Sequence, residues 1–563
     1  MLHEFTRTPR VAYFSMEIAL SSDIPTYAGG LGVLAGDTLR SSADLGLHMV
    51  GVTLVSRAGY FNQKIDAYGK QIELTQLWDP SAHAALLCTK ISVKIEKRIV
   101  WVGAWLYRIV GLGGVEVPVI LLDTDLPENS LEDREITHFL YGRDATYRFK
   151  QEMVLGIGGV RMLQALGFSV TKHHMNEGHS ALLAIELLHR HAYHKRDLRP
   201  GESRYDLPVV RSKCIFTTHT PVEAGQDKFD YAIVDSVAEG EITDLQLLRN
   251  LAGEESLNMT RLALNLSDYV NGVAKCHAAV SQRMFPSYHV HAITNGVHPH
   301  TWTSQTFAQL YDEHISGWRH EPEQLVRIDQ VPNELILNAH QTNKQILIDL
   351  VKRISGQTLD INLPTFGFAR RMTAYKRPDL IFSDIEKLRD IAKKHPFQLI
   401  MAGKAHPSDE RGKQIIQSIH SYIHELDGEI KIVYLSGYDM NMALDFVSGV
   451  DVWLNTPLRP LEASGTSGMK AAFNGVPSLS VLDGWWLEGC IEGVTGWSVG
   501  NKEEGNEAND IEALYQKLEN VVLPLYENKN IWTLLMKNVI GRNASVFNTH
   551  RMVRRYVLEA YML

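Results

Sequence analysis

The residues best suited to chemistry lie in a ten-residue loop from Leu461 to Lys470, which reads L-E-A-S-G-T-S-G-M-K. The loop combines one carboxylate, three hydroxyls, two glycines and a terminal lysine. It follows the apolar run Val450–Leu454, which predicts a buried strand, and precedes a segment that can continue as a helix. A small-residue loop between a strand and a helix is where α/β proteins hold anionic groups. Lys470 could also form an imine with an aldehyde cofactor.

A second group consists of four cations within eight residues, namely Arg370, Arg371, Lys376 and Arg377. They come directly after a predicted strand at Thr365–Phe368, on the side where parallel α/β sheets bind ligands. Arginine suits phosphate through its planar fork, and lysine suits it as a point charge. A run of charges is more often a solvated face, so the position after a strand is what favours an anion site.

A glycine-rich loop near the start of the chain reads Y-A-G-G-L-G over residues 27–32. It lies between a predicted strand at Val11–Met16 and a predicted helix at about 33–45, and a second strand is expected at Met49–Val55. Glycines at such a corner let backbone amides approach an anion at the helix N-terminus. An ordinary tight turn would use the same residues, so the glycines alone do not decide between the two.

Three further groups have structural interpretations that are at least as strong as functional ones. His219 follows a predicted strand among threonines, where a hydrogen-bonded structural role is more common. Glu177 and His179 have no convincing third partner at ligand spacing, so we reject a metal site there. Trp485 and Trp486 could stack on sugar rings, although core packing is expected for at least one of them.

Composition and charge exclude several classes of protein. The chain has 563 residues and a net charge of −9, so it lacks the basic field of a nucleic-acid-binding protein. The widely spaced cysteines fit a reducing compartment and argue against a cysteine-built zinc site; they are Cys88, Cys214, Cys276 and Cys490. Charges interrupt the apolar residues near the N-terminus, and no apolar run approaches the roughly 20 residues that span a bilayer. We expect a soluble, cytoplasmic protein without nucleic-acid or membrane partners.

The alternation of strands and helices predicts an α/β fold with two domains, 1–294 and 295–563. The boundary is placed in the turn-rich stretch 293–299. In the first domain, a β-rich excursion is expected over 91–122 and helical structure over 131–166. The second domain should hold a mostly parallel sheet with strands at 365–368, 398–401, 431–434, 450–454 and 477–481. From about residue 510 the chain is predicted to be largely helical, and these helices could pack back on the first domain.

Five motifs in the same chain order resemble those of the glycogen and α-glucan phosphorylases. E-A-S-G-T-S-G-M-K resembles the pyridoxal-phosphate lysine motif of this family. The other four are Y-A-G-G-L-G, T-H-T, T-N-G-V-H-P-H-T-W and R-R-M-T-A-Y-K-R. The resemblance runs from about residue 11 to residue 486, and Y-F-S-M-E-I-A and V-L-D-G-W-W are most similar to the shorter bacterial and archaeal branch.

The resemblance implies a fold, a reaction and a cofactor. The fold would be two Rossmann-like domains facing each other across a cleft, the glycosyltransferase-B fold. The reaction would be reversible, retaining phosphorolysis of an α-1,4-glucan or maltooligosaccharide by orthophosphate, which gives α-D-glucose 1-phosphate. Pyridoxal 5'-phosphate would be held by Lys470, with the cofactor phosphate relaying a proton to and from the substrate phosphate. A homodimer without the nucleotide and phosphoserine regulation of the animal enzymes is expected.

The resemblance also implies roles for individual residues. The expected catalytic residues are Lys470, Arg371, Lys376 and His219. Cofactor binding is expected of Lys470, Arg370, Thr466, Ser467, Trp302 and Tyr438. Phosphate binding is expected of Gly29, Gly30, Arg371 and Lys376. Glucose binding is expected of Leu31, His219, Asn295, Glu462, Ala463, Ser464 and Gly465. No metal ligand is expected.

The sequence departs from the family pattern at several of these positions. Ser467 replaces a glycine of the animal motif, and Arg370 replaces a lysine, which keeps the charge but changes the geometry. Tyr438-Asp439 is the nearest match to a Tyr-Arg pair near the cofactor, so a cation would be lost there. The segment 176–179 replaces one that contains aspartate, which could alter glucan subsites.

Three alternative functions stay open at this point. A nucleotide-sugar glucan synthase has the same fold but needs no lysine in the 461–470 loop. A glycoside hydrolase could use paired carboxylates such as Glu462 with Glu177 and would need no phosphate. The third alternative is a non-catalytic glucan-binding protein.

Overall fold

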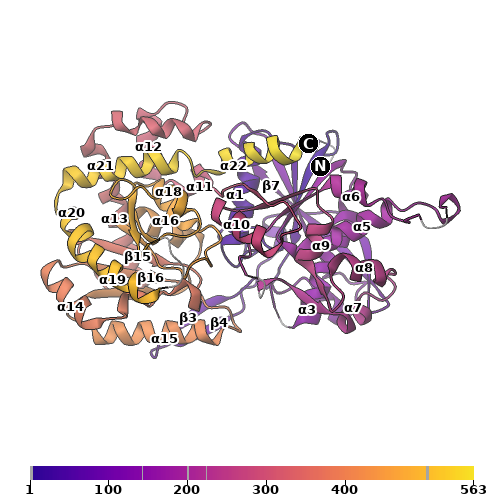
Figure 1. Cartoon of the computed structure of the whole chain (residues 1–563), viewed down its shortest axis with the longest axis horizontal. Helices are drawn as coiled ribbons and strands as arrows, with labels where there is room; N and C mark the ends of the chain where they lie inside the picture. Colours follow the sequence, from indigo (N-terminus) through magenta and orange to yellow (C-terminus); the bar gives the residue numbers. More distant parts are fainter. Residues whose placement is uncertain (1–3, 143, 200–201, 223–224, 502–505, 563) are drawn as a thin grey trace.

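The computed structural model describes residues 4–142, 144–199, 202–222, 225–501 and 506–562. The chain forms two α/β halves that lie side by side, with the earlier part of the sequence in one and most of the later part in the other (Figure 1). Each half is built on its own sheet and has its own large apolar core. The predicted α/β class with facing halves is confirmed. None of the described helices is both long enough and apolar enough to cross a membrane.

The sheet of the first half is parallel over most of its width. Its parallel strands are, in spatial order, β14 (His291–Ala292), β13 (Tyr269–Gly272), β10 (Cys214–Thr217), β9 (Val170–Asn176), β1 (Arg10–Phe14), β2 (Met49–Leu54) and β8 (Glu116–Asp123). An antiparallel edge is added by β7 (Arg98–Val110), β5 (Ala85–Leu86) and β6 (Ile91–Ile95). This edge is the β-rich excursion that the sequence predicts. Every residue of β2 and β10 is buried, as parallel strands covered on both faces require.

Helices cover this sheet and connect its strands. They are α1 (Gly30–Asp44), α2 (Leu131–Arg134), α3 (Ala145–Met153), α4 (Gly159–Ala165), α5 (Leu182–Arg190), α6 (Leu207–Lys213), α7 (Tyr231–Val237), α8 (Leu245–Ala252), α9 (Met259–Asn265) and α10 (Lys275–Met284). A small antiparallel pair joins β11 (Lys228–Asp230) to β12 (Ser256–Asn258). The helical stretch expected over 131–166 is interrupted between α2 and α3. Asp144 is the N-cap of α3, since its side chain accepts a hydrogen bond from the amide of Tyr147.

The second half has an entirely parallel six-stranded sheet. Its spatial order is β17 (Lys431–Leu435), β16 (Gln398–Ala402), β15 (Thr365–Ala369), β18 (Val452–Asn455), β19 (Ser478–Val481) and β20 (Gly496–Val499). Its helices are α13 (Asn333–Ser355), α14 (Ile385–Lys394), α15 (Glu410–Glu425), α16 (Met440–Gly449), α17 (Ser467–Ala472), α18 (Trp486–Gly489), α19 (Glu507–Lys517), α20 (Leu523–Glu527) and α21 (Lys529–Val539). Five of these strands are predicted from the sequence, whereas β20 is an addition.

Among the described residues, the contacts between the halves include the last helix and a hairpin, besides the linker with α11 (Pro299–Trp302) and α12 (Gln305–His314). The last helix, α22 (Thr549–Tyr556), returns to the first half, where Met552 and Val553 join a small apolar cluster with Leu34 of α1. This return is visible in Figure 1, where the end of the chain reaches the half that contains the N-terminus. The expected domain boundary at 294/295 stays a prediction.

The hairpin of β3 (Asn62–Ile65) and β4 (Gln71–Leu74) is the second connection, and it extends from the first half toward α15 (Figure 1). Gln63 donates to the carbonyl of Gly403 at 2.8 Å. Gln71 donates to the carbonyl of Ala405 and accepts from its amide, both at 2.9 Å. Because both glutamines are buried, these bonds fix the loop after β16 against the first half.

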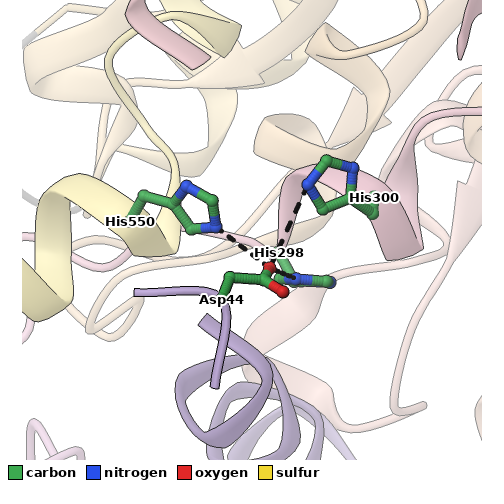
Figure 2. A group of neighbouring side chains, drawn as sticks. All are labelled: Asp44, His298, His300 and His550. Atoms are coloured by element: carbon green, nitrogen blue, oxygen red, sulfur yellow. Dashed lines mark hydrogen bonds and ion pairs between the residues drawn. The ribbon is translucent and has the colours of Figure 1, made fainter. Parts of the chain in front are cut away.

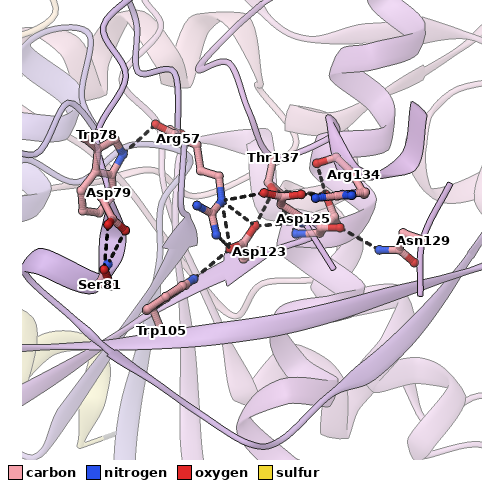
Figure 3. Close-up of polar contacts among 12 residues, drawn as sticks. Arg57, Trp78, Asp79, Ser81, Trp105, Asp123, Asp125, Asn129, Arg134 and Thr137 are labelled. Atoms are coloured by element: carbon pink, nitrogen blue, oxygen red, sulfur yellow. Dashed lines mark hydrogen bonds and ion pairs between the residues drawn. The ribbon is translucent and has the colours of Figure 1, made fainter. Parts of the chain in front are cut away.

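A polar network ties the ends of the neighbouring strands β2 and β8 (Figure 3). Asp123, the last residue of β8, accepts hydrogen bonds from Arg57 at 2.6 Å and from the indole of Trp105 at 2.8 Å. Arg57 also lies 3.5 Å from the carboxylate of Asp125. The network therefore fixes the direction in which the chain leaves β2, toward Tyr60 and Phe61.

Candidate active site

A cavity of about 500 Å³ lies between the two halves and is lined by residues of both. The structure brings together around it every site residue expected from the sequence, namely Gly29, Gly30, Leu31, His219, Asn295, Trp302, Arg370, Arg371, Lys376, Tyr438, Glu462, Ala463, Ser464, Gly465, Thr466, Ser467 and Lys470. The reason is topological. The loops after β10, β15, β17 and β18 all leave the carboxyl ends of parallel strands, which meet at one edge of each sheet.

Glu462 is held by two cations inside this cavity. Its carboxylate oxygens lie 2.6 and 2.7 Å from the Lys376 ammonium, and one of them also accepts from Arg370 at 2.6 Å. Burial would raise the pKa of Glu462, but Arg370 and Lys376 together hold it below its ordinary value. The Glu462 carboxylate is therefore ionised and suited to accept hydrogen bonds, and it is not suited to act as a catalytic acid.

Arg370 has unused hydrogen-bond donors beside Glu462. Only its Nη2 is bonded to Glu462, while its Nε and Nη1 are buried and have no hydrogen-bond partner. A buried guanidinium with free donors is costly unless an anion satisfies it. Arg371, next to it, is exposed to the cavity. These two arginines and Lys376 provide a binding place for phosphate-like groups.

The fourth cation of the run has a structural role instead. Arg377 is buried and donates to the carbonyls of Thr456 at 3.0 Å and Pro457 at 2.9 Å. Its Nη2 also lies 2.7 Å from Asp510 of α19, and it adopts a positive φ of 44°. Arg377 therefore fixes the loop after β18, and it does not line the cavity.

Lys470 lies on α17 with its ammonium buried in the cavity wall. Its Nζ is 3.8 Å from the centre of the Trp302 ring. Burial lowers the pKa of Lys470 to about 8, against the opposing charge of Asp37. Asp37 in turn accepts from the Trp302 indole at 2.7 Å. A buried lysine with a lowered pKa is the form that reacts with an aldehyde.

The glycine loop is supported from beneath by a buried carboxylate that was not expected. Glu17 accepts hydrogen bonds from the amides of Ala28 at 2.6 Å and Gly29 at 3.1 Å, and from Tyr141 at 2.9 Å. The Gly29 amide is thus used inside the protein. The donors left for an anion are the first-turn amides of α1, which starts at Gly30.

The two glycines differ in the space around them. A Cβ atom on Gly29 would lie 3.3 Å from the Arg371 guanidinium, whereas one on Gly30 would find nothing within 4 Å. The loop therefore keeps Arg371 close to the start of α1, with open space beside Gly30. An anion in that space would meet an arginine and a helix N-terminus together.

His219 is hydrogen-bonded as the structural interpretation predicts, and it also lines the cavity. Its Nε2 lies 2.6 Å from Oδ1 of Asn176, which can only accept, so Nε2 carries the proton. Burial lowers the pKa of His219 to about 3, so the ring is neutral. Its Nδ1 is then an acceptor for a hydroxyl of a ligand.

Two oxygen atoms of residues that line the cavity are buried without a hydrogen-bond partner. They are Oγ of Ser464 and Oδ1 of Asn295. The backbone carbonyl of Asn295 accepts a hydrogen bond from Arg551 at 2.9 Å, which fixes the position of this residue. Both residues line the cavity, so a ligand rich in hydroxyl groups would satisfy atoms that the protein itself leaves unpaired.

Sequence reasoning missed Lys404, which also lines the cavity. It lies two residues after the end of β16 and donates to the carbonyl of Phe61 at 3.2 Å, and burial lowers its pKa. The signal was available, because a cation just after a strand is the pattern that identified Arg370. Asp439 stands at the position where the family pattern is expected to have a cation. It caps α16 by accepting from the amide of Met442 at 2.8 Å, which explains an aspartate at this position.

The other residues that the sequence suggested for sugar binding or catalysis have structural roles. Trp485 and Trp486 are 3% and 0% exposed, so core packing holds for both. Glu177 accepts from the amides of Gly178 and His219 and from the Thr220 hydroxyl, at 3.2, 2.8 and 3.0 Å. Glu177 does not line the cavity that holds Glu462, so the two carboxylates do not flank a common substrate as a hydrolase would require.

A second cavity of about 390 Å³ adjoins the first, since both are lined by Tyr60 and Phe61. Its other lining residues include Tyr141 and His406. Aromatic rings of this kind present flat apolar faces next to polar groups. The two cavities together can take a ligand longer than one small molecule.

Comparison with known proteins adds independent findings. A family model described as carbohydrate phosphorylase matches residues 223–495. A maltodextrin phosphorylase from Thermococcus litoralis is 40% identical, over 98% of this chain and 70% of its own length. A glycogen phosphorylase from Aquifex aeolicus is 35% identical, over 99% of this chain and 87% of its own. A glycogen phosphorylase from Mycobacterium tuberculosis is 34% identical, over 98% of this chain and 70% of its own.

Proposed function

The chain belongs to the carbohydrate phosphorylase family, and from this premise we propose that it catalyses reversible phosphorolysis of α-1,4-glucans. Orthophosphate takes the terminal glucose unit, and the products are α-D-glucose 1-phosphate and a glucan shorter by one unit. The observation that carries this proposal is the pairing of Glu462 with Arg370 and Lys376, beside the free donors of Arg370. One cavity thus offers a carboxylate for sugar hydroxyls and cations for phosphate.

Three groups are proposed to hold the substrate phosphate. Arg371 and Lys376 provide the positive charge, and the first-turn amides of α1 at Gly30 and Leu31 provide donors. Support comes from the placement of Arg371 beside Gly29 and the open space beside Gly30. The fold places these groups around one space, where Lys376 would exchange its pairing with Glu462 for the phosphate.

The residues around Lys470 fit pyridoxal 5'-phosphate as the proposed cofactor. Lys470 would hold it covalently, Trp302 would pack beside it, and its phosphate would be bound by Arg370, Thr466, Ser467 and Tyr438. The fit rests on the buried lysine with its lowered pKa and on the unpartnered Nε and Nη1 of Arg370. When bound, the cofactor phosphate supplies a proton donor and acceptor next to the substrate phosphate. We add Lys404 to this set, because it compensates for the cation missing at Asp439.

The glucose unit is proposed to bind on the opposite side of the cavity. Glu462 accepts from its hydroxyl groups, and His219, Asn295 and Ser464 complete the contacts, with Leu31, Ala463 and Gly465 lining the wall. The unpaired atoms of Asn295 and Ser464 support this placement. The rest of the glucan would extend into the adjoining cavity beside Tyr60 and Tyr141.

One set of assays separates this function from its alternatives. Maltoheptaose is incubated with the protein and pyridoxal phosphate under three conditions: with orthophosphate, without it, and with UDP-glucose. Phosphorolysis predicts glucose 1-phosphate in the first condition alone. Free glucose without phosphate would indicate a hydrolase, and chain growth from UDP-glucose would indicate a synthase. No turnover in any condition would favour a non-catalytic glucan-binding protein.

A homodimer is a further proposal, and it rests on family membership alone. Light scattering after gel filtration measures it directly. A mass of twice the chain's 63.4 kDa is expected. A mass of one chain across a range of concentrations would contradict it.

A further inference from the structure

A cluster of metal-binding side chains lies outside the cavity, where α1, the linker and α22 meet (Figure 2). It consists of Asp44 at the end of α1, His298 and His300 around the start of α11, and His550 in α22. Each residue offers one ligand atom, and these atoms all lie within 4.8 Å of one another. Because the residues are spread from position 44 to position 550, only the folded chain brings them together.

We propose that this cluster binds a zinc ion. Three imidazole nitrogens and one carboxylate oxygen are ligands that zinc prefers, and four protein ligands make a closed, structural type of site. His550 and His298 are buried, and Asp44 and His300 are largely so. A site this closed holds its ion away from solvent and from substrates.

The distances suit a small tetrahedral ion. Oδ2 of Asp44 lies 2.8 Å from Nε2 of His298, 3.2 Å from Nε2 of His550 and 4.0 Å from Nε2 of His300. Zinc with bonds of about 2.0–2.1 Å places its ligand atoms roughly 3.3 Å apart. Small shifts of the side chains therefore convert the arrangement into a coordination sphere.

Contacts outside the cluster orient two of the ligands. Oδ1 of Asp44 accepts from the amide of Leu112 at 2.8 Å, which leaves Oδ2 for the metal. Nδ1 of His298 accepts from the Thr301 amide at 3.2 Å and lies 2.7 Å from the Thr301 hydroxyl, which fixes the direction of the ring. Nε2 therefore carries the proton that points to Asp44, and zinc binding at Nε2 requires the loss of this proton. His300 must change more, because its Nε2 lies 2.9 Å from the Arg319 carbonyl and exchanges that partner for the ion.

A purely hydrogen-bonded cluster is the competing explanation. In that arrangement Asp44 accepts from His298 and His550, and His300 stays on the Arg319 carbonyl. Such a cluster binds no metal and does not need His300. The two explanations therefore differ in zinc content and in the effect of changing His300.

The expected role of the ion is to fasten α22 to the first half. His298 is also linked to α1 through its amide, which donates to Asp37 at 3.1 Å, and Asp37 holds the Trp302 indole beside Lys470. Zinc would therefore stabilise the junction that supports the cavity wall. Removing it should lower thermal stability whether or not the protein acts on glucans.

The test uses the untagged full chain, stripped with a chelator, equilibrated with zinc and passed through a desalting column. We expect about one zinc per chain by mass spectrometry of the metal, and a higher melting temperature with zinc than without it. His300→Gln and His550→Gln should each lose most of the bound zinc. His48→Gln, which changes an exposed histidine near Asp44, should keep it.

Cobalt provides a second readout that does not depend on the variants folding. Four-coordinate cobalt at a site of this kind absorbs visible light more strongly than cobalt in water, and zinc should displace it. A wild-type chain that retains no zinc and shows no such absorption would overturn the proposal. Full zinc retention by both His300→Gln and His550→Gln would overturn it as well.

Discussion

Nζ of Lys376 lies 2.6 and 2.7 Å from the two carboxylate oxygens of Glu462, so a cation expected to bind phosphate is paired with a carboxylate expected to bind sugar. The pair couples the binding of the two substrates, glucan and phosphate. A glucose hydroxyl on Glu462 draws its charge away from Lys376, and a phosphate on Lys376 frees Glu462 for the sugar. Binding of one substrate should therefore depend on the other.

Glu462→Gln tests this coupling directly. Removing the negative charge leaves Arg370 without its counter-charge, so orthophosphate should bind at least about tenfold more tightly in the absence of glucan. Lys376 should contribute less to this gain, because burial and Arg370 lower its pKa to about 7 and Glu462 is the group that raises it. Glucan turnover should fall, because the sugar loses its ionised acceptor. Calorimetric titration with phosphate measures the first effect. Unchanged or weaker phosphate binding would contradict the coupling, and Glu492→Gln on the surface of the same half is the matched control.

Arg371→Ala should separate phosphate binding from cofactor binding. The change removes a cation beside the start of α1, so turnover should fall on the order of 10²- to 10³-fold. The cofactor should stay bound, because Lys470 and Arg370 are untouched, and its absorbance gives that measurement. Arg389→Ala, at a half-buried site outside the cavity, should keep wild-type turnover. Loss of the cofactor together with activity would show that the assignment of Arg371 is wrong.

Arg377→Ala should lower the free energy of unfolding, although Arg377 is the neighbour of the site residue Lys376 in the sequence. Its buried guanidinium donates to Asp510 and to the carbonyls of Thr456 and Pro457. Arg459 keeps Asp510 paired in the variant, so the loss of these hydrogen bonds should cost about 1–3 kcal/mol. Denaturant unfolding of the variant should show a loss of that size. A variant as stable as wild type but inactive would place Arg377 in the site instead.

The rate at which the apoprotein takes up pyridoxal phosphate should follow the titration of Lys470. The neutral amine reacts, and a pKa of about 8 leaves roughly one molecule in ten neutral at pH 7. Uptake should therefore rise with pH and level off above about pH 9. An ordinary lysine would give rates still rising well above pH 9, and that result would contradict the burial of this amine.

Sequence alone locates much of this site because its residues follow strands. Arg370 and Arg371 come directly after β15, and the loop that ends at Lys470 follows β18, so the parallel topology fixes where they meet. The same rule could have found Lys404. It could not have found Glu17, because its role depends on a turn that folds the glycine loop back over it.

Contacts between distant segments are the part that the sequence does not show. Asp44 and His550 meet only because α22 returns to the first half, and no local pattern predicts which surface a terminal helix packs on. The buried glutamines Gln63 and Gln71 are a similar case. They look like ordinary polar residues of an exposed hairpin, yet they bind the loop of Lys404 across the two halves.

The most direct test of the central claim is glucose 1-phosphate formation from maltoheptaose by the wild type and by Lys470→Ala, each supplied with pyridoxal phosphate and orthophosphate. The wild type should form glucose 1-phosphate in step with the shortening of the glucan, and only when phosphate is present. Lys470→Ala should neither retain the cofactor after gel filtration nor form the product. Phosphorolysis by the variant at the wild-type rate, or glucan shortening by the wild type without phosphate, would contradict the proposed function.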